Sequence, residues 1–273
     1  MIDFRSLQIE HFCEQLAHHH QRIFGDSEVE LLQNTLNISR MALAKMSISN
    51  SLFLNVNHTK RAGIIALEIL DGVLHNTGFV DPRLFFNLVM ATLISHVGIV
   101  GGILEEDEVN PNQPTERYYV GKGKYQTFAA PSSGSVLWPY YKERSLLFVD
   151  KNFRSLKNFN AEDVKLAIRA SDIAAKETSK DKTDLCRLVR ASHILAYMTQ
   201  SQYNQWLVRL YRSLEEAGLI ENLKFNDLGE FRTNYKSYFW DNFLPDLTYA
   251  IKLLNGTGTG KGLVAVVYSR MSV

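Results

Sequence analysis

The sequence predicts an all-α protein that carries one small β-hairpin insertion. Apolar residues recur at the three-to-four-residue spacing of a helix face over most of the chain. Residues that commonly cap helices precede several of these segments. A stretch rich in Pro, Gly, Ser and Asn, at about 105–135, interrupts the helical pattern. These three observations indicate one helical body with a β-containing insertion.

The helices of the first half are marked by their caps. Ser27 or Asp26 is expected to cap one helix, because acidic residues follow in its first turn. Asp81 and Pro82 are expected to begin another, with Asp as the cap and Pro at the first helical position. A further helix at the N-terminus contains His18 to His20. After this N-terminal helix, the expected ranges are about 27–46, 57–74 and 81–98.

The insertion and the second half follow the same reasoning. The segment 117–128, RYYVGKGKYQTF, is typical of a hairpin around Gly-Lys-Gly. Asn160, Asp184 and Ser201 are expected to cap later helices. The expected helices lie at about 139–150, 160–177, 184–199, 201–218 and 227–255. The helices from about 200 to 255 form the C-terminal part of a single domain that spans 1–273.

A glycine-rich segment near the C-terminus, NGTGTGKG at 255–262, is not a phosphate-binding loop. That loop needs four residues between its first Gly and the Gly-Lys pair, and Gly256 to Gly260 leaves only three. Gly262 then stands where Ser or Thr is required. We expect a flexible exit from a helix into a short terminal strand.

Composition restricts the class of protein. Hydrophobic residues make up 45% and charged residues 22%, which is ordinary for a globular chain of 273 residues with one sizeable core. The net charge of +1 provides no broad basic field, so nucleic acid is not an expected partner. The two cysteines, Cys13 and Cys186, form no paired motif, which fits a reducing compartment. The N-terminal segment has no apolar signal core, and a cytoplasmic location is expected.

One segment has the length of a membrane span. No Asp, Glu, Lys or Arg occurs from 84 to 104. Asn87, Ser95 and His96 are polar, however, and glycines at 98, 101 and 102 interrupt its second half. We therefore expect a buried core helix and no membrane span.

Three histidines are expected to face the interior. His18, His19 and His20 are adjacent, so they point in different directions and are expected on the solvated surface. His58, His96 and His193 instead each share an apolar helix stripe. A hydrogen-bonded core histidine explains any one of them taken alone. Three together also fit a shared site, because neutral imidazoles are good metal ligands and buried ones need partners. Periodicity leaves both interpretations open.

Several short elements occur in a distinctive order. They are LNVNHT at 54–59, the segment 86–104 that contains ISHVGIVGGIL, LWPYYKERSLLFV at 137–149, LVRASHIL at 188–195, QYN at 202–204, LEEAG at 214–218 and YFW at 238–240. In this order they resemble the HD-domain metal-dependent phosphohydrolases, distant relatives of the cyclic-nucleotide phosphodiesterases, and more closely a bacterial branch with a characteristic insertion. The resemblance extends from about residue 8 to the end of the chain. It implies an HD-domain/PDEase-like helical bundle.

The resembled family holds one or two metals with a His, a His-Asp pair, sometimes a further His, and a distant Asp. His58 and His96 match this pattern. Val97 stands where the pair has its bridging Asp, Tyr141 where the further His occurs, and His193 where the distant Asp occurs. The site that the resemblance implies has therefore lost its carboxylates. The loss of the bridging carboxylate and of the further His together removes the geometry for a second metal.

Other residues are expected around this site. The resemblance places Asp172 near the pocket, where its carboxylate either substitutes for a missing ligand or is simply solvated. Arg144 and Arg190 match family positions, and each is expected to meet a phosphate or to form a structural salt bridge. Asn57, Val97 and Tyr141 complete the expected pocket lining.

These observations support three functions. The first is a diverged phosphohydrolase, a pseudoenzyme with a degenerate site that binds a small phosphorylated ligand or a partner protein. The second is an active metal-dependent enzyme, a phosphohydrolase or oxygenase, with a single Zn²⁺, Fe²⁺ or Mn²⁺ on His58, His96 and His193 and water at the open position. The third is a scaffold that uses its surface and homodimer contacts. Val97 favours the first function, while His193 keeps a ligand-type residue and leaves enzymatic activity open.

Overall fold

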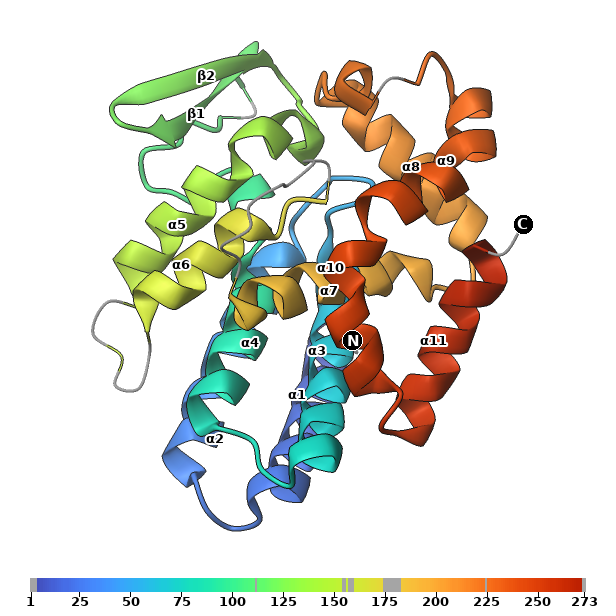
Figure 1. The fold of residues 1–273 in the computed structure, drawn as a ribbon. Helices are drawn as coiled ribbons and strands as arrows, with labels where there is room; N and C mark the ends of the chain where they lie inside the picture. Colours follow the sequence, from blue (N-terminus) through green and yellow to red (C-terminus); the bar gives the residue numbers. More distant parts are fainter. Residues whose placement is uncertain are drawn as a thin grey trace.

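The computed structural model describes residues 4–110, 112–153, 156, 160–173, 183–223 and 225–271. In these ranges the chain is mostly helical with one two-stranded sheet (Figure 1), which confirms the expected fold class at this level. The helices are α1 Phe4–Phe24, α2 Val29–Met46, α3 Val56–Thr77, α4 Pro82–Ile94, α5 Tyr141–Asn152, α6 Ala161–Ala170, α7 Asp184–Met198, α8 Tyr203–Glu216, α9 Leu228–Asn242, α10 Leu244–Leu254 and α11 Gly258–Met271. Short 3₁₀ helices are η1 Val97–Ile99, η2 Gly134–Tyr140 and η3 Ile220–Leu223.

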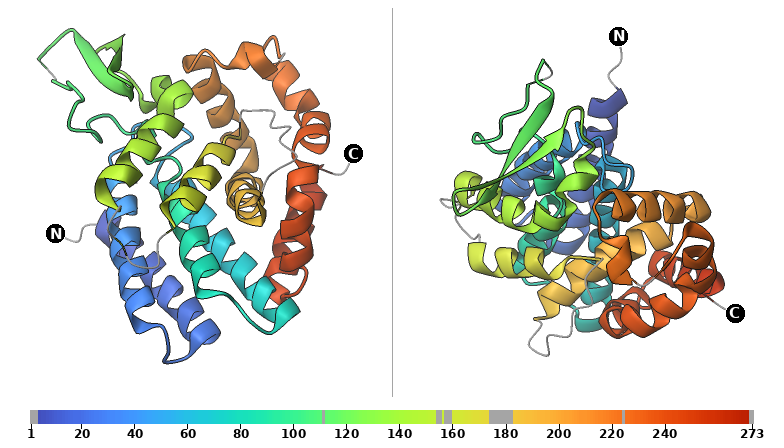
Figure 2. Two further views of the ribbon diagram at one scale, coloured as in Figure 1. Left: turned by 60° about the vertical axis from the view of Figure 1, so that its left-hand side comes forward. Right: turned by 90° about the horizontal axis from the view of Figure 1, so that it is seen from above.

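The centre of the molecule is built on α3, α4 and α7. Of the 15 residues of α7, 12 are buried, and of the 13 residues of α4, 10 are buried. Helices that are buried on nearly every side are core helices rather than surface helices. In Figure 1, α3 and α7 lie in the middle of the bundle and α1 and α2 cover α3 and α4 on one side. The C-terminal helices α8, α9 and α11 form another side (Figure 2).

The insertion forms the expected hairpin. Strand β1 Thr115–Gly121 pairs antiparallel with β2 Lys124–Ala129. Gly121, the last residue of β1, and the two turn residues, Lys122 and Gly123, have positive φ, at 94°, 52° and 71°. Glycine adopts such angles without steric cost, which explains the Gly-Lys-Gly sequence. The hairpin lies beside α5 at the edge of the molecule (Figures 1 and 2).

Two of the expected helix caps are present. The side chain of Asp81 accepts a hydrogen bond from the N–H of Arg83 at 2.8 Å, with Pro82 at the first helical position. Asn160 accepts from the N–H of Asp163 at 3.2 Å. These residues satisfy backbone donors that have no partner within the helix.

The other expected caps were wrong by one or two positions. The residue before α2 is Glu28, in a left-handed conformation, while the Ser27 hydroxyl donates back to Phe24. Helix α7 is capped by Thr183 rather than Asp184. Helix α8 follows Gln202, which makes no side-chain cap hydrogen bond, rather than Ser201.

The C-terminal segment differs most from expectation. The single helix expected at 227–255 is two helices, α9 and α10, because Pro245 lies in the first turn of α10 and starts a new helix. The expected terminal strand is instead α11. A Cβ at Gly260 would lie 2.1 Å from the carbonyl oxygen of Leu254, so glycine permits this tight turn between α10 and α11. The helix expected at 160–177 is shorter than predicted: α6 ends at Ala170 with Ser171 as its C-cap, and positions 174–177 lie outside the described residues.

The apolar segment tested for a membrane span is largely internal. Within the described residues, Pro82–Ile99 is the one stretch that is long and apolar enough to cross a membrane, and 83% of it is buried inside the protein. Core helices pass the same test of length and composition, so this segment is weak evidence for a span.

Gly98 fixes the approach of α5 to the segment that follows α4. A Cβ at this position would lie 2.1 Å from the carbonyl oxygen of Tyr141. The Ser145 hydroxyl bridges the same contact, since it accepts from the N–H of Gly98 and donates to the carbonyl of Ser95, both at 2.9 Å. The close packing therefore places Tyr141 beside His96.

Candidate functional site

Three histidines from distant parts of the chain meet in the core. His58 lies in the first turn of α3, where the Asn55 side chain caps the helix and accepts from the N–H of His58 at 3.3 Å. His96 lies between α4 and η1, and His193 lies within α7. One ring nitrogen from each lies within 4.8 Å of the others. The three apolar helix faces that were expected to bury these histidines therefore meet in the core.

The rings are in direct contact. The His58 and His193 rings stack at a centroid distance of 5.4 Å, and those of His96 and His193 meet edge to face at 4.2 Å. His58 Nε2 lies 3.3 Å from His193 Nδ1. Nitrogen ligands at 2.0–2.1 Å from a tetrahedral zinc lie about 3.3 Å apart, so this pair already has the spacing of two metal ligands. The third ring needs a shift of at most about 1.5 Å to reach the same spacing.

The three imidazoles are buried and neutral. Their exposed fractions are 1% for His58, 1% for His96 and 0% for His193. Burial lowers the pKa of His58 to about 3 and the pKa of each of the other two well below the ordinary value of 6.5. Repulsion between the rings lowers the pKa values of His96 and His193 further. Near neutral pH all three rings are therefore uncharged, the form that binds metals.

Most of the ring nitrogens lack a partner. Of the six nitrogens, the four without a hydrogen bond to any described residue are His58 Nδ1, both nitrogens of His96 and His193 Nε2. A buried polar atom without a partner costs about 1–3 kcal/mol. Buried histidines normally avoid this cost through a hydrogen bond, and here the protein atoms that the structure describes supply only the contact between His58 and His193.

The surroundings of the three histidines are aromatic and apolar. Phe53 lies 5.0 Å from the His58 ring, Trp206 lies 6.5 Å from it, and Tyr141 lies 5.1 Å from the His96 ring, all measured between ring centroids. Val97 is fully buried. Within the described part of the chain, the group of ligand atoms contains no carboxylate. Phe53 and Trp206 carried no signal in the sequence that would have linked them to His58.

Arg144 is a structural residue. It is fully buried, and its guanidinium forms a two-point ion pair with Asp107, with both contacts at 2.8 Å. It also donates to the carbonyl oxygens of Gly98, Val100 and Tyr119 at 2.6–3.0 Å. These contacts use all five N–H groups, so of the two roles expected from the sequence, Arg144 has the structural one.

The remaining expected pocket residues lie outside the histidine cluster. Arg190 is buried and pairs with Asp246 at 2.9 Å. The Asp172 carboxylate pairs with Lys142 at 3.1 Å and is not among the clustered ligand atoms. Asn57 is exposed, and its N–H donates to the Asn55 side chain. Of the expected lining, only Val97 and Tyr141 border the cluster.

A second buried group corrects the expectation of a solvated His18–His20 segment. His18 is exposed, but His19 and His20 are 8% and 1% exposed. His19 Nδ1 lies 2.9 Å from Asp71 Oδ2, and the Arg22 guanidinium contacts both. Glu68 is close enough to complete a set of possible metal ligands. Because a cation already occupies the centre of this group, it is an ion-pair network rather than a second metal site.

The chain belongs to the Npun_R2479-like family. The family model of that description matches residues 2–273, almost the whole chain, and the description names no activity. No curated protein and no solved structure gives a significant match.

Proposed function

We propose that this protein is a mononuclear metalloprotein in which His58, His96 and His193 hold one divalent ion, Zn²⁺ or Fe²⁺. The observation that carries the proposal is the convergence of three neutral, buried imidazoles with four unpartnered ring nitrogens. An ion that bound one nitrogen of each ring would remove this cost for the nitrogens that it contacts. The resemblance to HD-domain phosphohydrolases supports the same assignment, because His58 and His96 match two of that family's ligands.

A divalent ion held by three imidazoles keeps an open position and lowers the pKa of a bound water toward about 7. The protein residues keep the imidazoles uncharged and, through Phe53, Tyr141 and Trp206, exclude bulk water. No carboxylate in the described cluster offsets the charge of the ion. The arrangement therefore favours an anionic substrate group, and we assign single-metal hydrolysis of a small phosphoester as the activity.

A second candidate function is the diverged, inactive homologue. It is favoured by Val97, an apolar and fully buried residue at the position of the family's bridging carboxylate. It is also favoured by the near-complete burial of all three histidines, which leaves little open path for a substrate. In this case the fold would bind a ligand or partner without chemistry at the cluster.

Metal content separates the two functions. The purified full-length chain should contain about one equivalent of Zn or Fe by elemental analysis, and His58→Ala, His96→Ala and His193→Ala should each lose it. His20→Ala is the matched control, because His20 is an equally buried histidine outside the cluster. Metal-free wild-type protein, after purification without chelators and reloading with Zn²⁺, Fe²⁺ or Mn²⁺, would exclude the metalloprotein.

Hydrolysis of p-nitrophenyl phosphate by the loaded protein then tests the activity. We expect turnover in the wild type and in His20→Ala, and background rates in the cluster variants. Stoichiometric metal without turnover of any phosphomonoester or phosphodiester would support the inactive homologue with a structural ion.

A further inference from the structure

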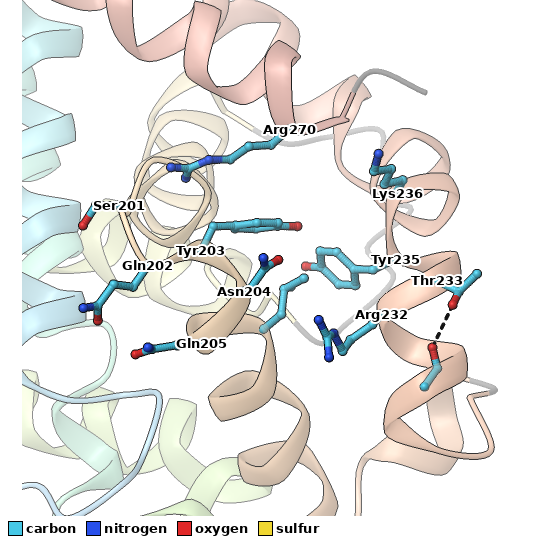
Figure 3. A pocket seen from close by; sticks show the side chains of 12 residues that line it. Ser201, Gln202, Tyr203, Asn204, Gln205, Arg232, Thr233, Tyr235, Lys236 and Arg270 are labelled. Atoms are coloured by element: carbon cyan, nitrogen blue, oxygen red, sulfur yellow. Dashed lines mark hydrogen bonds between the residues drawn. The ribbon is translucent and has the colours of Figure 1, made fainter.

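A cleft of about 900 Å³ lies between the first turn of α8, one face of α9 and the end of α11 (Figure 3). None of the three clustered histidines lines it. Small-molecule sites commonly have volumes of about 300–1,000 Å³, so the cleft has the size of a metabolite site. It is separate from the proposed metal centre and is not required by it.

The charges around the cleft are all of one sign. Arg232 and Lys236 line it from α9 and Arg270 lines it from α11, while no Asp or Glu is among the residues that line it. Arg232 is exposed and forms no ion pair within the ranges that the structure describes. A concave surface with cations and no carboxylate concentrates positive potential and attracts anions.

Arg270 is held in place at the edge of the cleft. Its guanidinium donates to the carbonyl oxygen of Met198 and lies 5.2 Å above the ring of Tyr203. Figure 3 shows Arg270 across the top of the Tyr203 ring, with Arg232 on the opposite side of the cleft. Partial burial lowers the pKa of Arg270, since the charged guanidinium has lost part of its hydration. An anion in the cleft would replace that lost solvation.

The N-terminus of α8 adds to the positive potential. Residues 202–205 line the cleft, Gln202 makes no side-chain cap hydrogen bond, and the first turn contains no acidic residue. The free N–H groups of a helix N-terminus carry a partial positive charge and bind phosphate groups. This observation is independent of the arginines, and it points to the same kind of ligand.

We propose that this cleft binds a small phosphorylated molecule, with its phosphate between Arg232, Arg270 and the first turn of α8. The planar guanidinium groups suit phosphate oxygens. Tyr203 supplies an aromatic surface for the rest of the ligand. A polynucleotide is disfavoured, because the net charge of +1 provides no extended basic surface beyond the cleft.

Calorimetric titration of the full-length chain with ADP, pyrophosphate and adenosine tests the proposal. We expect ADP and pyrophosphate to bind and adenosine, which lacks phosphate, to show no heat. Arg232→Gln and Arg270→Gln should each weaken pyrophosphate binding about ten-fold or more. Arg209→Gln is the control, because it removes the same charge from α8 at a residue that does not line the cleft. Circular dichroism checks that each variant folds.

The titrations are repeated with His58→Ala in EDTA, so that a phosphate bound at a metal is not mistaken for one in the cleft. Unchanged pyrophosphate binding there supports the cleft. The proposal is overturned if neither ADP nor pyrophosphate binds at millimolar concentration, or if Arg209→Gln weakens binding as much as Arg232→Gln. It is also overturned if only a single-stranded oligonucleotide binds.

Discussion

Two buried histidine groups lie at opposite ends of α3, and they differ in the partners available to their buried polar atoms. At the C-terminal end, His19 Nδ1 and Asp71 Oδ2 contact each other and Arg22, so protein atoms balance the charge, and only Asp71 Oδ1 of this carboxylate has no described partner. At the N-terminal end, His58, His96 and His193 contact mainly one another and leave four ring nitrogens without a described partner. Burial alone therefore does not identify a site. The convergence of three unpartnered rings distinguishes the second group, because a single ion could contact one nitrogen of each ring.

The largest expected difference between the two groups is their response to metal. Zinc at a thousand times its dissociation constant should stabilise the wild type by about 4 kcal/mol, because the ion binds only the folded cluster. The measurement is urea unfolding with and without EDTA. His19→Ala should keep this increment and His58→Ala should lose it. Equal stability of the wild type in zinc and in EDTA would remove the distinction between the two groups.

The pH dependence of the metal-free protein sharpens the comparison. The pKa of His193 is well below 6.5 in the folded state, so the unfolded chain binds more protons and stability falls as the pH drops below 6.5. Burial of this neutral ring therefore makes the folded protein less stable in acid.

His193→Leu should therefore lose less stability than the wild type as the pH falls from 6.5 to 4.5, as measured by urea unfolding in EDTA. His19, whose pKa burial lowers to about 4, contributes equally to both proteins and cancels. Identical pH slopes would mean that His193 is solvated in the folded protein.

The stability of the group formed by His19, Arg22 and Asp71 should depend on the charge of Asp71 and should not depend on metal. Asp71→Asn should destabilise the protein by about 2 kcal/mol, because His19 and Arg22 lose their charged acceptor and Arg22 is half-exposed, which limits the cost. Bound metal, measured by elemental analysis, should stay at the wild-type level. A drop in metal content would connect the two groups through α3.

The smallest expected effect concerns the position of His58. Asn55→Ala removes the cap of α3 and should cost about 1 kcal/mol. Because His58 lies in the first turn, zinc affinity should fall as well, while Asp81→Ala, which uncaps α4 away from the cluster, should cost a similar amount and leave affinity unchanged. Unaltered zinc affinity in Asn55→Ala would show that packing alone positions His58.

Local signals in the sequence were sufficient for much of the fold. Asp81 and Asn160 cap helices as expected, and the Gly-Lys-Gly turn forms the hairpin. Pro245 carried enough information to divide the last long helix, because a proline favours the first turn. The glycines of the terminal segment misled, since Gly260 serves a close backbone contact rather than a flexible loop.

Of the site, only the three clustered histidines were predictable, because helix periodicity placed each of them on a buried face. The apolar stripes of His58, His96 and His193 pointed inward, and the structure brings these residues together. The partner of Arg144 is Asp107, 37 positions away, and no local pattern connects them. The burial of His19 depends on how α1 packs against α3, which is a property of the tertiary structure.

Gly98 allows the close backbone contact that fixes the chain next to His96. The backbone after His96 is fixed by the close approach of Tyr141 and by the two hydrogen bonds of Ser145, none of which involves the side chain at position 97. A side chain at position 98 would displace this framework, whereas the fully buried Val97 side chain takes no part in these contacts. The path of the backbone beside His96 is thus set by residue 98 and α5, apart from the ring nitrogens of the histidine cluster.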